Sequence, residues 1–235
     1  MTAANLDTLS KQTGVPLWML KVVQDVESPK ITVHSFKAGM LLLSIERSRC
    51  ERLHILHQLV ALVTTLKEAK LISMESRKFG EKLMGAALRR WNQVGEAAVH
   101  NSTSFLETSN LVRDLPPRSQ SKKLAVEKCF TLASSFTEAK FVFHNSMSET
   151  ALSHEALKAM IEYANTMNEA KEAYNSCHLG DPLQIKAMRK WTSLSRQALS
   201  EANSTEAIRA LTKLIPHDGE AMEFAAKRAL QIADA

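Results

Sequence analysis

Apolar residues recur along most of this chain at intervals of three and four positions, the spacing of one face of an α-helix. The clearest stripe lies in the stretch from Asp181 to Leu214 and consists of Leu183, Ala187, Trp191, Leu194 and Ala198. An alternation of period two, typical of strands, never extends over a useful length. The pattern therefore predicts an all-α protein, a multi-helix bundle of about eight to eleven helices in two helical subdomains.

Residues at the ends of this stretch predict a helical hairpin. Asp181 suits an N-cap because its carboxylate can accept hydrogen bonds from first-turn amides, and Pro182 suits the first helical position. Asn203 is expected to cap a second helix, with Glu206 three residues later as in a capping box, and Pro216 ends the pattern.

Similar stripes predict helices elsewhere in the chain. We expect short helices near 5–11 and 16–28, a long helical region from 35 toward 70, helices over 73–100 and 124–143, and a helix that begins with a capping box at 146–149 and runs to about 174. No internal repeat of a fixed period stands out.

Charge is distributed unevenly along the 235 residues, whose net charge is +5. Residues 1–123 contain 18 Lys and Arg against 11 Asp and Glu, whereas residues 124–235 contain 12 against 14. The change of sign coincides with the polar, proline-containing stretch 114–123. We therefore predict a basic N-terminal helical domain over 1–113, a linker over 114–123 and a C-terminal helical domain over 124–235.

Catalytic and cofactor motifs are absent from the sequence, so a non-enzymatic protein without cofactors is expected. The seven scattered glycines form neither a GxGxxG motif nor a P-loop, and no HExxH or CxxC motif occurs. Glu46, Cys50, His54 and His57 share a helical face, but a straight helix would spread them over roughly 16 Å, too far for one metal ion. No metal site is therefore expected.

The chain has three cysteines, Cys50, Cys129 and Cys177, an odd number without close pairing, so we expect reduced thiols. Reduced thiols indicate an intracellular location, in the cytoplasm, with the nucleus as a further compartment. The sequence has no secretory signal and no run long enough to span a bilayer, so any membrane association is expected to be peripheral, at the inner face of a viral or host membrane.

Basic residues form two groups that are candidates for binding an anion, either lipid or RNA. One group lies on a predicted helix, the other in the predicted linker, and the candidates are Arg77, Lys78, Lys82, Arg89, Arg90, Arg118, Lys122 and Lys123. Such side chains suit phosphate groups, with salt-sensitive binding that does not depend on sequence. A solvated helix face is the alternative.

The hairpin stretch resembles the C-terminal region of influenza-type matrix proteins of orthomyxoviruses. The likeness covers roughly residues 148–214 and rests on Pro182-Leu183, on Arg189 six positions after Leu183, on Ala198 and Ala202, and on the turn from Asn203 to Ala207. This resemblance implies an all-helical protein that polymerises under the viral envelope, binds anionic lipid through a basic face and contacts the ribonucleoprotein.

The sequence thus leads to a non-enzymatic viral structural, matrix-like protein that self-assembles into a homo-oligomer and binds an anionic membrane surface, with RNA or ribonucleoprotein as a further partner and no small-molecule substrate. The alternatives are an RNA-binding nucleoprotein and a cellular helical adaptor whose grooves accept partner helices.

Overall fold

The computed structural model describes residues 32–45, 48–146, 150–217 and 219–233, together with residues 8, 10–13, 16 and 17. The described residues form twelve α-helices, one more than the upper end of the expected range, and one short 3-10 helix, without a strand. The prediction of an all-α multi-helix bundle is confirmed. The short helices expected near 5–11 and 16–28 lie largely outside the described residues, as does the capping box expected at 146–149.

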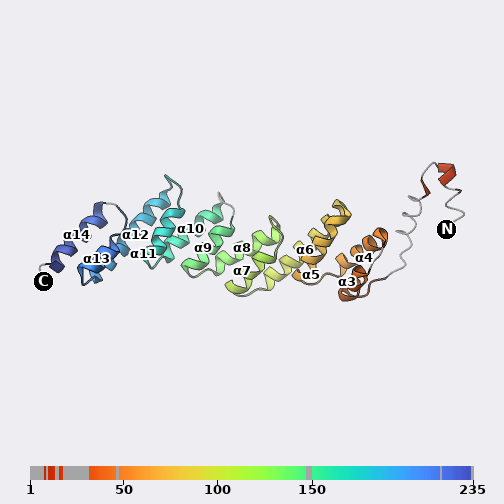
Figure 1. Ribbon diagram of the computed structural model, residues 1–235, viewed down its shortest axis with the longest axis horizontal. Coiled ribbons are helices and arrows are strands. Elements are labelled where there is room, and N and C mark those ends of the chain that lie inside the picture. Colours follow the sequence, from red (N-terminus) through yellow and green to blue (C-terminus); the bar gives the residue numbers. More distant parts are fainter. Residues whose placement is uncertain are drawn as a thin grey trace. The chain divides into compact units, whose positions relative to one another are not determined.

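The chain divides into two compact units, residues 1–102 with 110–124, and residues 103–109 with 125–235. Figure 1 labels the elements in chain order. Their bounds are α3 (Phe36–Ser44), α4 (Arg49–Leu62), α5 (Leu66–Ser76), η1 (Arg77–Phe79), α6 (Glu81–Asn101), α7 (Phe105–Asp114), α8 (Gln120–Leu132), α9 (Phe136–Asn145), α10 (Ala151–Tyr163), α11 (Met167–Ser176), α12 (Pro182–Glu201), α13 (Thr205–Leu211) and α14 (Gly219–Ala233).

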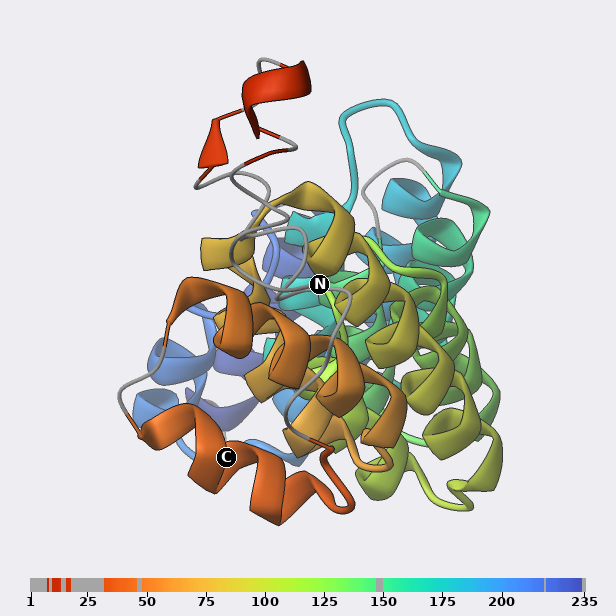
Figure 2. The ribbon, with the colours of Figure 1, turned by 90° about the vertical axis from the view of Figure 1, so that its right-hand side faces the viewer.

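Each helix packs mainly on the helices that follow it in the chain. In the first unit α3 packs on α4 and α5 on α6, and the orange to yellow helices can be followed in Figure 2. In the second unit the pairs are α9 with α10, α11 with α12 and α13 with α14, while α12 also contacts α10 and α14. Local packing of this kind is typical of proteins built from stacked helical hairpins.

One short turn leads into α3, α5, α7, α9, α11 and α13, so it precedes these hairpins rather than joining the two helices of each, and it occurs six times, at 33–39, 63–69, 102–108, 133–139, 164–170 and 202–208. Its third residue is a serine or threonine whose hydroxyl accepts a hydrogen bond from the amide three residues later, as Ser135 does from Glu138. In four copies that later residue is a glutamate, and its carboxylate accepts from the turn amides, as Glu169 does from Asn165 and Thr166.

The copies begin at intervals of 30, 39, 31, 31 and 38 residues, which is why no fixed period is visible in the sequence. The two long intervals contain α6 and α12, which have 21 and 20 residues. The repeat is therefore one of turn geometry rather than of length.

Within this series, residues 80–116 and 180–216 correspond at a constant offset of 100. Nine residues of the first stretch recur unchanged 100 positions later, where they are Gly180, Leu183, Ala187, Arg189, Trp191, Ala198, Ser204, Leu211 and Pro216. The Trp91 indole donates to the Asp114 carbonyl at 3.0 Å, and the Trp191 indole donates to the Leu214 carbonyl at 3.1 Å. Both tryptophans are buried, so Trp191 is the core residue that its helical stripe predicted.

Several predicted helices are shorter than expected because the turns interrupt them. The region 35–70 contains α3, α4 and the start of α5, and 124–143 contains parts of α8 and α9. Asp181 does cap α12, accepting from the Leu183 amide at 2.8 Å. However, α13 is capped by Ser204 and not by Asn203.

The predicted linker is also shorter than expected. Asp114 ends α7 and α8 begins at Gln120, so only residues 115–119, including both prolines, connect the two helices. The division into domains at 114–123 stays a prediction.

Candidate functional site

The first group of basic candidates lies where η1 leads into α6. Gly80 has a φ of 105°, a left-handed conformation that favours glycine, and it turns the chain from η1 into the first residue of α6. Arg77 and Lys78 lie on η1, and Lys82 and Arg89 on α6; all four are exposed. Lys82 and Arg89 are seven residues apart and therefore share one face of the helix.

Only part of this positive charge is balanced locally. Glu75 lies 3.4 Å from the Lys78 ammonium and 3.9 Å from the Arg52 guanidinium. Within the part of the chain that the structure describes, Arg77, Lys82 and Arg89 make no ion pair. Burial, followed by the charges of His54 and Lys82, lowers the pKa of His57 below its usual value of 6.5, so His57 adds no charge near pH 7.

Arg90 has a structural role that differs from its predicted anion contact. Its Nε and Nη2 atoms donate to the Val63 carbonyl at 3.0 and 2.7 Å, at the end of α4. Tyr163 donates in the same way to the Ala133 carbonyl, and Arg228 to the Ala202 carbonyl. These contacts satisfy a carbonyl that its own helix leaves without a partner.

The second basic group lies at the start of α8, beside the middle of α6 and far from Lys82. The Ser121 amide donates to the Asn92 side chain at 2.9 Å, which fixes the start of α8 beside the middle of α6. Lys82 lies ten residues before Asn92, about 15 Å away along the helix axis. Arg118 and Lys123 are exposed, Lys122 is half-buried, and Arg118 has a φ of 57°. Arg89 lies only three residues before Asn92 on α6, so it is the member of the first group nearest along that helix to the start of α8, and Arg90 is engaged elsewhere.

The histidine and cysteine candidates do not form a metal site among the described residues, in which no group of three or more possible ligands comes together. Glu46 lies outside the described residues. Cys50, His54 and His57 all lie on α4, where the His54 ring contacts the Gln58 amide at 2.6 Å.

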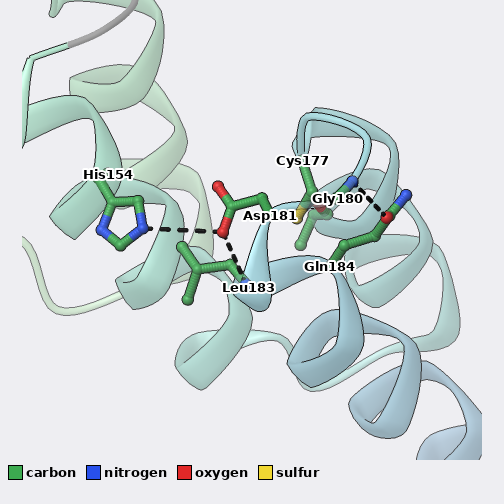
Figure 3. A network of polar contacts seen from close by, with 7 residues as sticks. His154, Cys177, Gly180, Asp181, Leu183 and Gln184 are labelled. Carbon is green, nitrogen blue, oxygen red and sulfur yellow. Dashed lines mark hydrogen bonds and ion pairs between the residues drawn. The ribbon is translucent and has the colours of Figure 1, made fainter.

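A polar network at the start of α12 brings a histidine, an aspartate and a cysteine together in the second unit (Figure 3). The His154 ring lies 3.8 Å from the Asp181 carboxylate, and the Cys177 thiol donates to the Ala173 carbonyl. Burial and the charge of Asp181 raise the pKa of the Cys177 thiol to about 11. A thiol with that pKa is almost wholly protonated at pH 7, so this network is unsuited to nucleophilic catalysis.

A groove lies in the first unit, beside the turn between α4 and α5. Its volume is about 500 Å³, and its lining comprises Thr64, Thr65, Leu66, Arg90, Gln93, Val94, Ala97, Ala98 and Asn101. Gln93, Ala97 and Asn101 are exposed at intervals of four along α6. A smaller groove of about 190 Å³ lies in the second unit, between the end of α8 and α10. Sequence reasoning missed both, because it did not place the turns that form their edges.

No helix in the described ranges is long and apolar enough to cross a membrane. Comparison of the chain with models of known protein families, with curated proteins and with solved structures gives no match. The fold and the surface chemistry therefore carry the functional argument.

Proposed function

We propose that this chain is a non-enzymatic binding scaffold built from helical hairpins. The observation that carries the proposal is the six-fold recurrence of one turn, which leads into successive hairpins and borders a groove and exposed helix faces. Stacked helical hairpins generally serve to present an extended surface to a partner. This is the helical-adaptor alternative, in which a groove accepts a segment of another protein.

The groove beside the α4–α5 turn supports this proposal. Its floor is the stripe of Gln93, Ala97 and Asn101, and the small Ala97 side chain leaves room for a partner backbone. The rest of its lining combines Thr64, Thr65 and Arg90 with the apolar Leu66, Val94 and Ala98, a mixture of polar and apolar groups that suits contact with a polypeptide.

Photo-cross-linking from a benzoylphenylalanine at position 97 tests this role in the full chain. The matched control places the same residue at Ala226, which is also exposed but lies on α14 in the second unit and does not line the groove. We expect one defined protein adduct from position 97 and none from position 226. Equal, diffuse labelling from both positions would count against a scaffold that uses this groove.

A second candidate function is favoured by the four exposed cations Arg77, Lys78, Lys82 and Arg89. In it the chain is a matrix-like viral structural protein that self-assembles and binds anionic membrane, or an RNA-binding protein that uses the same residues. The clustering of three cations without ion pairs in the described part of the first unit supports it, because such groups attract phosphate.

Sedimentation with phosphatidylserine and phosphatidylcholine vesicles at low and high salt tests this candidate. Binding should require phosphatidylserine, weaken with salt, and fall in Lys82→Glu and Arg89→Glu. Arg90→Met is the matched control and should bind as wild type, because the Arg90 guanidinium already faces the Val63 carbonyl. A gel shift with RNA separates the two anions, and electron microscopy of the vesicles reveals any ordered coat. Salt-independent binding to both vesicles would refute this candidate.

A further inference from the structure

The outward faces of α3 and α5 carry the same pair of residues in the same register. The second residue after each N-cap is a lysine, Lys37 in α3 and Lys67 in α5, and the sixth is a leucine, Leu41 and Leu71. Residues four apart on a helix lie on one face, so each lysine stands one turn before its leucine.

These leucines point away from the core. The buried position four residues after the cap is Gly39 in α3 and Ala69 in α5. The leucine follows two positions later, a rotation of about 200° at 3.6 residues per turn. Leu41 is accordingly 61% exposed and Leu71 40% exposed.

In α5 the apolar face extends by one more residue, because Met74 follows Leu71 by three positions and is 56% exposed. In α3 the stripe ends with Leu41, since Ile45 has an extended backbone after the end of the helix, although it is 53% exposed. Both helices thus have a stripe that begins with a lysine and continues with exposed apolar side chains. An exposed apolar stripe without a partner marks an interaction surface when several such residues lie together.

The repeated turn does not require this pair, because the other four copies lack it. At the two corresponding positions they have Leu106 and Asn110, Thr137 and Phe141, Asn168 and Glu172, and Glu206 and Ala210. Hairpin packing therefore does not explain the lysine and leucine of α3 and α5. A role at the surface of the first unit does explain them.

The charge of this face indicates the partner. Lys37 is the only charged residue of α3. In α5 the two glutamates are already engaged, Glu68 by the turn at Thr64 and Thr65, and Glu75 by Lys78. Lys37 and Lys67 make no ion pair among the described residues, so the face offers uncompensated positive charge beside its apolar stripe. A helix with apolar residues at every third or fourth position and carboxylates beside them is complementary to it.

We infer that the outer faces of α3 and α5 bind acidic amphipathic helices of a partner protein, with Leu41, Leu71 and Met74 contacting their apolar stripes and Lys37 and Lys67 their carboxylates. This inference rests on the proposed role as a binding scaffold and names its partner class. It uses a surface other than the groove beside the α4–α5 turn.

The test titrates the full chain into a fluorescent helical peptide of about 18 residues, with leucines every third or fourth position and glutamates beside them. The matched peptide replaces every glutamate with lysine. Wild type should bind the acidic peptide at least about tenfold more tightly than the basic one. Leu41→Ser with Leu71→Ser should weaken binding about tenfold or more, whereas Leu230→Ser, on the exposed end of α14, should not change it.

A charge exchange provides the second arm. Lys37→Glu with Lys67→Glu should lose the acidic peptide and gain the basic one, a result that misfolding cannot produce. Equal binding of the two peptides, or no effect of the leucine variants, would overturn the inference. The inference would also be overturned if the chain bound phosphatidylserine vesicles through these leucines but did not bind the peptide. It would likewise be overturned if Lys37 and Lys67 formed cross-links to carboxylates of residues 1–31 that the peptide does not displace. A groove adduct at position 97 would still support the scaffold in each of these cases.

Discussion

Two glycines in α6 provide a sharp test of the packing described above, because the same substitution should have opposite effects at the two positions. A Cβ on Gly95 would lie 2.3 Å from Leu115 Cδ2 and 3.0 Å from Ser121 Oγ. A Cβ on Gly85 would meet only the end of Arg89, at 3.6 Å. The first distance is a severe overlap, and the second is an ordinary contact.

The expected magnitudes follow from helix propensity and overpacking. Replacing glycine by alanine inside a helix stabilises the folded state by about 0.5–1 kcal/mol. Gly85→Ala should show this gain in full. At position 95 the side chains of Leu115 and Ser121 must also move, which costs about 1–3 kcal/mol, so Gly95→Ala should be destabilised by up to about 2.5 kcal/mol. The equivalent residue in α12 is Ser195, which shows that a side chain fits there when Ile215 replaces Leu115.

Urea unfolding followed by circular dichroism at 222 nm measures both variants against wild type. With a slope of about 2.5 kcal/mol per M, a difference of about 1–3 kcal/mol between the variants separates their midpoints by about 0.4–1.2 M. The wild-type midpoint should lie between them. If Gly95→Ala were as stable as Gly85→Ala, the close approach of Leu115 to α6 would be wrong.

Three further predictions follow from contacts in the hairpins. Trp91→Phe and Trp191→Phe should each lower the free energy of unfolding in urea by about 1–3 kcal/mol, since each variant loses one buried hydrogen bond and some buried apolar area. If the two losses differed by more than about 1.5 kcal/mol, the two hairpins would not be equivalent. Burial raises the pKa of Glu68, but hydrogen bonds from the turn residues outweigh this effect and hold that pKa below 4.5. The ionised Glu68 carboxylate therefore stabilises the folded state above pH 4.5, and this stabilisation is lost as the pH falls through the lowered pKa. Glu68→Gln should therefore lose less stability than wild type between pH 7 and pH 3, and a steeper loss would contradict this sign. Arg90→Met should lower stability by about 1–2 kcal/mol, because it loses the hydrogen bonds to a helix-end carbonyl. Arg90→Lys should have an intermediate stability, since Lys190 at the corresponding position makes a single such hydrogen bond. Equal unfolding midpoints for wild type and both variants would refute the role of Arg90 in joining hairpins.

The helical class of this protein could be predicted from periodicity, but most of its turns could not. The break at 133–135 consists of Ala133, Ser134 and Ser135, without glycine or proline, and apolar spacing continues on both sides of it. The Ser135 hydroxyl accepts from the Glu138 amide, and the Glu138 carboxylate accepts from the Ser134 amide, so contacts made from inside the second helix stabilise the turn. Where proline was present, after Asp181, the predicted N-cap is correct. A search for serine or threonine followed three residues later by glutamate, without a fixed period, would have found four of the six turns.

The candidate basic site was only partly predictable for a related reason. Sequence reasoning grouped Arg89 with Arg90 because they are neighbours, yet adjacent helical residues point about 100° apart. The structure places Arg89 on the exposed face, whereas Arg90 contacts the end of α4. No local pattern shows which arginine of such a pair has a structural role, because the carbonyl that Arg90 contacts lies 27 residues away.

The hairpin from Asp181 to Leu214 has a different significance once its internal counterpart is recognised. The residues that resemble a matrix-protein region include Leu183, Arg189 and Ala198, and all three recur 100 positions earlier as Leu83, Arg89 and Ala98. The first of these packs in the core, and the other two occupy equivalent positions on α6 and α12. The chain's own repeat accounts for them, so the likeness adds no independent support to a viral role. That role depends instead on the exposed cations of the first unit, and the vesicle experiment with Lys82→Glu and Arg90→Met tests it without reference to the hairpin.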